Sequence, residues 1–480
     1  MASDEAEALT HPAVVALVAA LTAQQAALEA AVAALTAEVA ALRTENAALR
    51  AQLAQPPRTP ANSSVPPAKG FKPNRAARRH AAAEDEPAPK RGPKPAHRGV
   101  SRSRLATVDA VLICRPERCA GCGHGLGTRA GVVVGRRQVV DLPAVRPLVT
   151  EARRLRLRCR HCGHHTAGSY PAGFGSHGRF GPRLLATISL LHEQHHVGYA
   201  RLAALLGELY GLAVSEGALV AAVQQVARRL DPDARTIAAQ VRQGGVVGSD
   251  ETHARVDGAT WWEWVFQTAD AAYHTIQQRR NTDVVLTFLE GVQPAVWVSD
   301  LWKPQLAAPA RRYQICLAHQ LRDLQYAIDG QRGFAQAWAR VTQALLRAAI
   351  HLRHQQDVGT VPSGGAAVRE LEATADRVLA AVLPPGWSAD LQRRFQQHRA
   401  ALLVFLHDPA VPPTNNASER SLRPSVVHRK VTGGFRSEAG AAAYAILRTV
   451  ADTARKRGQP VFTTILAALD RPPTTAPQPA

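Results

Sequence analysis

Three acidic residues stand where the chain could bind divalent metal ions. The short apolar runs VVGSD and VWVSD close on Asp250 and Asp300, and each predicts a buried strand that delivers an aspartate at its end. Glu419 follows in TNNASERSLRP, where Asn416 is predicted to cap a helix and Glu419 falls three residues later. Two strand-end aspartates and a helix glutamate can hold two Mg²⁺ or Mn²⁺ ions for in-line displacement at a phosphodiester. The alternative is that Glu419 only caps its helix.

Residues beside these acids are candidates for the same chemistry. Glu251 adjoins Asp250 and is a rival ligand, but neighbouring strand residues face opposite ways, so only one of the two can join the site. Arg420 and Arg423 lie on the predicted glutamate helix, and Lys430 follows them. Guanidinium groups bind phosphates through paired hydrogen bonds, so we expect DNA-phosphate contacts here. The alternative for these basic residues is a solvated helix face.

Four cysteines predict a second metal site. Cys119 and Cys122 form one C-x-x-C pair, and Cys159 and Cys162 form another. The two pairs flank strand-like sequence, VVVGRRQVVDLP and RRLRLRC, which is typical of a zinc ribbon with one structural Zn²⁺. Cys114 is predicted to be a spare, although it could replace Cys119.

A third motif, in LLHEQHHVGY, suggests a different function. His192, Glu193 and His196 have H-E-x-x-H spacing, the pattern of zinc metalloproteases. The extended pattern fails, because Tyr199 stands where a glycine is needed. A zinc protease therefore stays only as an alternative, and a packed or exposed histidine cluster is the preferred interpretation.

Charge and cysteine usage restrict the partners and the compartment. The 480 residues carry a formal net charge of +20, which indicates a polyanionic partner, by default double-stranded DNA. Genomic base bias explains arginine over lysine, but not the excess of basic over acidic residues. Six cysteines, four of them in metal-like pairs, favour a reducing cytosol. With no signal peptide and no uncharged apolar run of about 20 residues, we expect a cytoplasmic, nucleoid-associated protein that does not enter a membrane.

The elements around these sites follow in order. Residues 1–55 carry an unbroken heptad that predicts a parallel two-stranded coiled coil, with Asn46 fixing the register, and hence a homodimer or higher oligomer. A helix packed on its own chain is the alternative. The heptad leucines of this segment are Leu21, Leu28, Leu35, Leu42 and Leu49.

The basic, proline-rich residues 56–104 are predicted to be a disordered linker that either binds along DNA phosphates or only solubilises the chain.

Four further segments complete the predicted organisation. The zinc ribbon occupies 105–180, and two helical patterns flanking Gly211 predict a helix-turn-helix-like DNA-binding module at 181–243, although a plain helical hairpin gives the same pattern. The sequence pattern of residues 244–470 predicts a three-stranded meander, followed by a helix and two further strands. A mainly helical insertion at about 330–408 separates Asp300 from Glu419. The tail at 471–480 is expected to be disordered.

Several of these stretches together resemble the insertion-sequence-66 family of bacterial transposases. The resemblance is carried by NNASERSLRP with HRKVTGGFRSEAGAAAYA, by SDET with WWEWV, and by CLAHQLR, in the family's order. It implies a DDE transposase with an RNase-H-like core and the triad Asp250, Asp300 and Glu419. His319 matches the family's Cys-x-Ala-His block and Arg322 its second arginine, so both are candidates for the phosphate or the metals; a structural role for His319 is the alternative.

The resemblance also has departures and implied partners. Leu321 replaces an arginine of the family, and Asp300 is followed by Leu301 and Trp302 where the family often has Gly-Tyr. The implied protein is a multidomain α+β enzyme that binds element ends, cleaves and joins DNA strands with two Mg²⁺ ions, and acts with possible helper proteins. An inactive DNA-binding or regulatory relative is one alternative. A metal-dependent nuclease without strand transfer is another.

Overall fold

The computed structural model describes residues 12–53, 55–59, 61–63, 103–128, 130–171, 174 and 180–471. Most of the predicted linker at 56–104 and of the predicted tail at 471–480 therefore lies outside the described residues. The chain divides into two compact units, of which the first comprises residues 1–71, 178–199 and 217–480, and the second residues 72–177 and 200–216.

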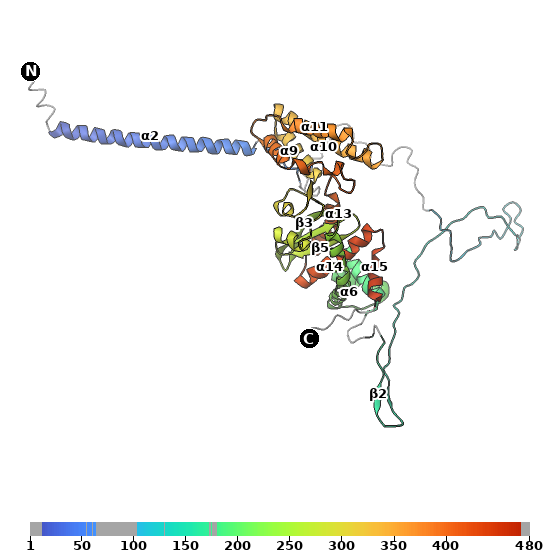
Figure 1. Cartoon of the computed structure of the whole chain (residues 1–480). Coiled ribbons are helices and arrows are strands. Elements are labelled where there is room, and N and C mark those ends of the chain that lie inside the picture. The colour runs from blue at the N-terminus through green and yellow to red at the C-terminus, as the bar shows by residue number, and fades with distance from the viewer. Residues whose placement is uncertain are drawn as a thin grey trace, which may run out of the picture. The chain divides into compact units, whose positions relative to one another are not determined.

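A single long helix, α2 (Pro12–Leu53), covers the predicted heptads and ends before Pro56 (Figure 1). Its sequence is rich in alanine, the strongest helix former. Leu28, Leu35 and Leu42 are all more than half exposed in this single chain. A helix with an exposed stripe of leucines at seven-residue spacing has its apolar face available for a partner, so the coiled coil stays a prediction.

Part of this helix also has the length and apolar composition of a membrane span. The window Thr22–Arg43 has a mean hydropathy of 1.4 and is the one such helix in the described part of the chain. It carries Glu29 and Glu38, which fall between the heptad leucines. Length and composition alone thus do not distinguish a span from the predicted coiled coil.

A five-stranded mixed sheet forms the centre of the first unit (Figure 1). Its strand order is β5-β4-β3-β6-β7: the first three strands pair antiparallel, and β6 and β7 add parallel to β3. The predicted meander and the two later strands are therefore confirmed. The strands are β3 (Val246–Val256), β4 (Ala259–Gln267), β5 (Ala272–Gln277), β6 (Val296–Ser299) and β7 (Arg312–Ile315).

Local sequence explains the turns and crossovers of this sheet. Asp257 and Gly258 both have positive φ, 47° and 74°, and Asp-Gly is a favoured pair for a tight hairpin of this kind. Helix α7 (Thr282–Leu289) supplies the crossover from β5 to β6. Its Phe288 stacks on Phe266 of β4 with ring centroids 3.9 Å apart, which fixes the crossover helix against the sheet.

Two C-terminal helices pack on the antiparallel strands. Helix α13 (Asn416–Thr432) lies against β3 and β4, and α14 (Glu438–Lys456) lies against β5. Leu422 of α13 packs on Val265, and Tyr444 of α14 packs on Val256. Helix α15 (Val461–Asp470), which follows α14, packs on α4 (Pro182–Ser189), which precedes the sheet in the chain.

A helical layer stands between β7 and α13 in the chain, and its core is continuous with Val296 and Val298 of β6 and Ile315 of β7. Trp338, Phe395 and Phe405 are at most 4% exposed in this core. The mainly helical character predicted for about 330–408 is confirmed. The block consists of α9 (Leu317–Gly330), α10 (Gly333–Asp357), α11 (Ala366–Leu379), α12 (Trp387–Gln397), η3 (Arg399–Ala401) and η4 (Val404–Leu406).

The two helical patterns around Gly211 form α5 (Tyr199–Tyr210) and α6 (Glu216–Arg242). Gly211 has a φ of 67°, which favours glycine at the end of α5. From residue 217 onward, α6 belongs to the unit that contains the sheet. Its Arg242 donates to the Phe288 carbonyl at 2.6 Å, so the end of α6 is tied to the crossover helix. DNA binding by this pair of helices stays a prediction.

Candidate active site and metal centres

Asp250 and Asp300 lie level with each other, just past the end of the parallel pairing between β3 and β6. The last paired residues of β3 and β6 are Gly248 and Val298, and each aspartate follows its paired residue by two positions. Asp300 directly follows β6, as predicted. Asp250 does not end its strand, which corrects the prediction: β3 continues to Val256 because β4 goes on pairing with it.

Glu419 comes from the first turn of α13, but not at the predicted capping position. The helix cap is Asn415, not Asn416, so Glu419 stands one position deeper than the sequence suggested. Ser418 occupies the third helical position instead, and its hydroxyl donates to the Asn415 side chain at 2.6 Å. The capping explanation for Glu419 is therefore wrong, because serine and not glutamate bonds the cap residue. The carboxylate of Glu419 is left for another role.

The start of α13 is joined to β3 immediately before Asp250. The Asn415 side-chain amide donates to the Ser249 carbonyl at 2.7 Å. Gly248 makes this approach possible, because a Cβ there would lie 3.2 Å from the Ser418 hydroxyl and 3.4 Å from the Asn415 side-chain oxygen. These contacts bring the helix that carries Glu419 to the strand that carries Asp250.

The electrostatics of Asp250 reflect this convergence. Burial raises the pKa of Asp250 well above its ordinary value. Repulsion from Glu251 and then from Asp300 raises the pKa further, and Glu419 adds a smaller effect. Carboxylates that repel one another in a buried place favour a bound cation. The donor set is oxygen only, which suits Mg²⁺ or Mn²⁺.

Glu251 is engaged elsewhere. Its carboxylate accepts hydrogen bonds from Arg280 at 2.7 Å and from Gln305 at 2.7 Å. The Arg280 guanidinium in turn lies between the rings of Trp262 and Trp302, 4.4 and 3.9 Å from their centroids. Glu251 is thus paired with its own cation, in accord with the expectation that only one of the two adjacent acids joins the site.

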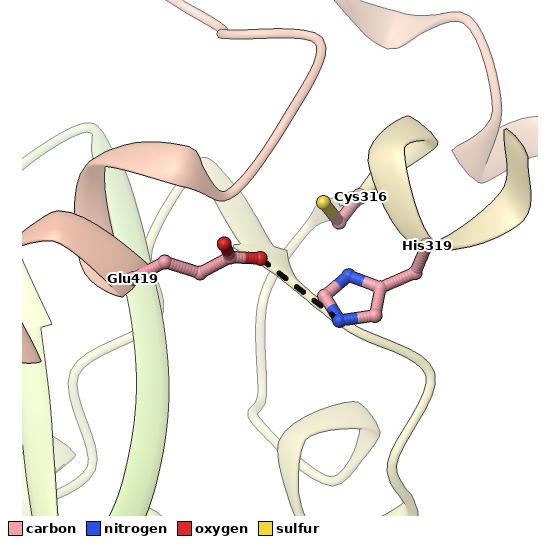
Figure 2. A group of neighbouring side chains, drawn as sticks. All are labelled: Cys316, His319 and Glu419. Carbon is pink, nitrogen blue, oxygen red and sulfur yellow. Dashed lines mark ion pairs between the residues drawn. The ribbon is translucent and has the colours of Figure 1, made fainter. Parts of the chain in front are cut away.

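Three residues from the CLAHQLR segment border Glu419: Cys316 and His319, which Figure 2 shows, and Arg322. His319 Nε2 and Arg322 Nη2 each lie 3.9 Å from Glu419 Oε1, and all three side chains are about a quarter exposed. The Cys316 thiol faces the same space, and burial raises its pKa. Sequence reasoning placed His319 and Arg322 here but gave Cys316 no role, although its C-x-x-H spacing to His319 was a usable signal.

The other basic candidates lie on the outside of α13. Arg420, Arg423 and Lys430 are exposed and follow each other at intervals of three and seven residues. That spacing keeps them on one face of the helix. The geometry therefore provides a basic surface beside Glu419, which is compatible both with phosphate contacts and with a solvated face.

A buried polar network holds α13 on β4, and sequence reasoning missed it. Gln267 donates to Ser418 at 2.7 Å and accepts from Ser421 at 3.2 Å. Glu263 accepts from Ser425 at 2.8 Å. The signal was a glutamate and a glutamine inside the apolar strand TWWEWVFQ. Such groups are buried only when partners satisfy them, so they fix the height and rotation of α13.

The H-E-x-x-H motif does not form a metal site. Residues Leu190–Gln194 form a π-helical turn, and His196 lies beyond it with a φ of 56°. The two histidines are therefore not one α-helical turn apart on a common face. Glu193 is fully buried, and burial raises its pKa well above the ordinary value. Its carboxylate lies 3.8 Å from Arg448 Nε, so the protease alternative loses its geometric basis.

Each cysteine pair forms a tight turn of its own. Gly123 donates to the Cys119 carbonyl and Gly163 to the Cys159 carbonyl, both at 2.9 Å, with φ values of 73° and 75° for the two glycines. Backbone hydrogen bonds, chiefly from the second cysteine of each pair, lower the pKa of the Cys119 and Cys159 thiols. Because zinc binds thiolates, each turn can supply two of the ligands of a four-cysteine zinc site.

The predicted hairpin between the two turns is only partly formed. Strands β1 (Arg156–Arg158) and β2 (His165–Ala167) pair around the second turn. The predicted strand over 132–143 is absent, and Val132 and Val139 there are 90% and 95% exposed, with no core to bury them. Among the described residues, the four thiols do not form a group within metal-binding distance.

Comparison with known proteins identifies both segments. The description "Transposase IS66 family" belongs to the family that matches residues 177–443, more than half of the chain. A second match covers residues 116–163, with the description "zinc-finger binding domain of transposase IS66", and contains all four paired cysteines. This match supports a zinc ion in that segment. No curated protein matches the chain.

One solved structure is also similar over part of its length. Its description is "CryoEM structure of simian T-cell lymphotropic virus intasome in complex with PP2A regulatory subunit B56 gamma". The sequences are 12% identical, the match covers 47% of this chain and 77% of that chain, and the TM-score of 0.14 is too low for a comparison of folds. Identity thus follows from the family matches: the chain belongs to the IS66 family of transposases.

Proposed function

We propose that this transposase cleaves DNA at element ends and joins the ends to a target through a DDE triad of Asp250, Asp300 and Glu419. The observation that carries the proposal is geometric: Asp250 and Asp300 each stand two residues past the last parallel pair of β3 and β6, and the cap of Glu419's helix donates to the residue before Asp250. Repulsion from Asp300 and Glu419 also contributes to the raised pKa of Asp250, after burial and Glu251, which supports a common site for the three acids. The mixed sheet order β5-β4-β3-β6-β7 supports an RNase-H-like core.

The three carboxylates would hold two Mg²⁺ or Mn²⁺ ions, which when bound neutralise the acids, activate a water or a DNA 3′-hydroxyl and stabilise the leaving oxygen. The protein's part is to fix the carboxylates before DNA arrives. Asn415 ties Glu419's helix to β3, and Gln267 ties it to β4. Preorganised charge of this kind stabilises a transition state without reorganisation.

Basic side chains around the triad would hold the DNA. His319 and Arg322 border Glu419 and are positioned to bind a phosphate oxygen at the scissile position. Arg420, Arg423 and Lys430, on the exposed face of α13, would follow the backbone of the same strand. The net charge of +20 supports salt-dependent, largely sequence-independent affinity for duplex DNA.

The remaining segments would recruit and pair the enzyme. One structural Zn²⁺ on Cys119, Cys122, Cys159 and Cys162 would close the zinc-finger domain, and α5 with α6 would contribute a helix-turn-helix-like DNA contact. The exposed heptad of α2 favours a parallel homodimer. A transposase is expected to be soluble and cytoplasmic, associated with the nucleoid. A regulatory relative without activity, or a nuclease without strand transfer, would use the same scaffold.

A cleavage and joining assay tests the proposal. The purified chain is incubated with end-containing duplex DNA and Mg²⁺, and nicked ends and joined products are scored separately. Asp300→Asn should lose both products by orders of magnitude, because a metal ligand is removed. The matched control Asp283→Asn, an exposed acid in the first turn of α7, should keep both. Nicking without joining by the wild type would indicate a nuclease, and unchanged products from Asp300→Asn would exclude the triad.

A further inference from the structure

A sulfur, a nitrogen and an oxygen donor meet beside the proposed triad. Cys316, His319 and Glu419 each offer one ligand atom, and these atoms all lie within 4.8 Å of one another. The side chains point into a common space from two different elements, α9 and α13 (Figure 2). Among the described residues, this is the single group of His, Cys, Asp and Glu with such spacing.

Two atoms of this group are buried without a hydrogen-bond partner. They are His319 Nδ1 and Glu419 Oε1. A buried polar atom without a partner costs about 1–3 kcal/mol, and more if it is charged. A cation among these ligands would remove that cost for the carboxylate. The arrangement is therefore better explained by a ligand than by packing alone.

The backbone fixes the ligands in place. Cys316 caps α9 and His319 lies in the first turn of that helix, which gives the C-x-x-H spacing common in metal sites. The Asn415 backbone N–H lies 3.1 Å from Cys316 Sγ, and the Leu317 N–H donates to the Pro413 carbonyl at 3.1 Å. The segment before α13 is thus joined to the start of α9, and Glu419 is held opposite the cysteine and the histidine.

We propose that Cys316, His319 and Glu419 bind a thiophilic divalent cation of the Zn²⁺ or Co²⁺ type. One sulfur, one nitrogen and one oxygen ligand suit these ions, whereas Mg²⁺ prefers oxygen ligands alone. Three protein ligands leave a fourth tetrahedral position open, in contrast to the closed four-cysteine site. The ligand atoms need only a small contraction, since ligands of a tetrahedral zinc lie about 3.3–3.8 Å apart given its bond lengths of about 2.0–2.3 Å.

The guanidinium of Arg322 competes with a bound cation for the carboxylate of Glu419. Its guanidinium lies 3.9 Å from the same Glu419 oxygen and is about a quarter exposed. A positive charge at this distance weakens the binding of a second cation. The site should therefore bind its ion more tightly when Arg322 is neutral, and Arg322→Gln provides a test in the opposite direction to the ligand variants.

Sharing of Glu419 gives the site a regulatory consequence, which rests on the proposed function. A thiophilic ion bound to Cys316 and His319 would draw Glu419 away from the oxygen-only site formed with Asp250 and Asp300. Strand cleavage in Mg²⁺ should then be inhibited by excess Zn²⁺. Cys316→Ser should make cleavage less sensitive to that inhibition, by at least tenfold in the Zn²⁺ concentration required.

Cobalt binding tests the site without any DNA chemistry. The full chain, already carrying its one zinc, is titrated with Co²⁺, and the thiolate-to-cobalt charge-transfer absorption is recorded. Wild type should bind one further ion with the absorption of a single thiolate. Cys316→Ser should lose that absorption, His319→Gln should weaken binding at least tenfold, and Arg322→Gln should strengthen it. The control Cys114→Ser, which removes an exposed unpaired cysteine, should behave as wild type.

The outcomes separate this inference from the proposed function. No added absorption in the wild type, or absorption that persists in Cys316→Ser while the zinc content is unchanged, would overturn the site. Cobalt binding that depends on Cys316 in a protein without DNA cleavage would keep the site and remove the proposed function. Cobalt binding with cleavage that Zn²⁺ does not inhibit would remove the sharing of Glu419.

Discussion

The acid site and the cysteine turns are built in opposite ways. The acids come from β3, the end of β6 and α13, and long-range contacts such as Asn415 to Ser249 and Gln267 to Ser418 bring them together. Each cysteine turn is closed by hydrogen bonds within its own few residues, such as Gly123 to Cys119. The first site is therefore a product of the folded core, and the second is a pair of local structures without a core to join them.

This difference determines what a bound metal ion must contribute at the acid site and at the cysteine turns. At the acids, the fold holds β3, the end of β6 and α13 together, but Asp250, Asp300 and Glu419 do not all lie within 4.8 Å of one another, so a bound cation would only have to draw the carboxylates closer. At the cysteines, exposed valines such as Val132 and Val139 show that apolar burial does not assemble the segment. Zinc binding must then supply the folding free energy that a hydrophobic core supplies elsewhere.

Loss of the zinc ion from the cysteine site should have the largest effect on folding. Cys159→Ser should lose about one zinc per chain and unfold the zinc-finger segment, since structural zinc contributes roughly 10–16 kcal/mol in small metal domains. All seven tryptophans lie between positions 261 and 387, so tryptophan fluorescence should report an unchanged core. Zinc content and limited proteolysis check the segment itself.

Cys114→Ser is the control for this experiment, because Cys114 lies outside both C-x-x-C pairs. It should keep its zinc. Zinc retained in Cys159→Ser, or lost from Cys114→Ser, would contradict the four-ligand assignment. If the sheet-containing core of Cys159→Ser unfolds together with the zinc-finger segment, the two regions do not fold independently, which would contradict the comparison.

The stability of the core should depend on pH, with a smaller effect than the loss of zinc. His428 lies on the buried side of α13, and burial, with His192 and His196 nearby, lowers its pKa to about 3. Above about pH 6.5, the usual histidine pKa, it is neutral in both folded and unfolded chains. Below that pH only the unfolded chain takes up the proton, so stability falls as the pH is lowered toward 3. Between pH 6.5 and 5 the loss should be about 2 kcal/mol.

His428→Gln should remove this part of the acid sensitivity. Urea unfolding followed by tryptophan fluorescence at pH 7 and pH 5 measures the difference between variant and wild type. Glu193, whose raised pKa gives the opposite trend, is present in both proteins and cancels in the comparison. An equal loss of stability in both proteins would show that His428 titrates normally in the folded chain.

Local patterns in the sequence were enough to predict the strands of the mixed sheet, the long N-terminal helix and the helical insertion, but they were wrong for the strand over 132–143, which has no core to pack on. Apolar runs and heptads are properties of adjacent residues, so they could be read directly. The exact cap of α13 and the continuation of β3 past Asp250 could not, because each depends on a partner distant in the chain: Ser249 for the cap and β4 for the strand. The Gln267 network and the grouping of Cys316 with Glu419 have the same origin.

Glu419 is the residue on which the account depends most, since it is the acid that α13 contributes to the proposed triad. Glu419→Gln keeps the size and polarity of the side chain but removes its charge. The proposal predicts a loss of strand cleavage and joining by orders of magnitude in Mg²⁺, with DNA binding and urea stability close to wild type. Glu438→Gln, an exposed acid in the first turn of α14, is the matched control and should retain activity. A Glu419→Gln protein that cleaves and joins end-containing DNA at the wild-type rate would contradict the triad.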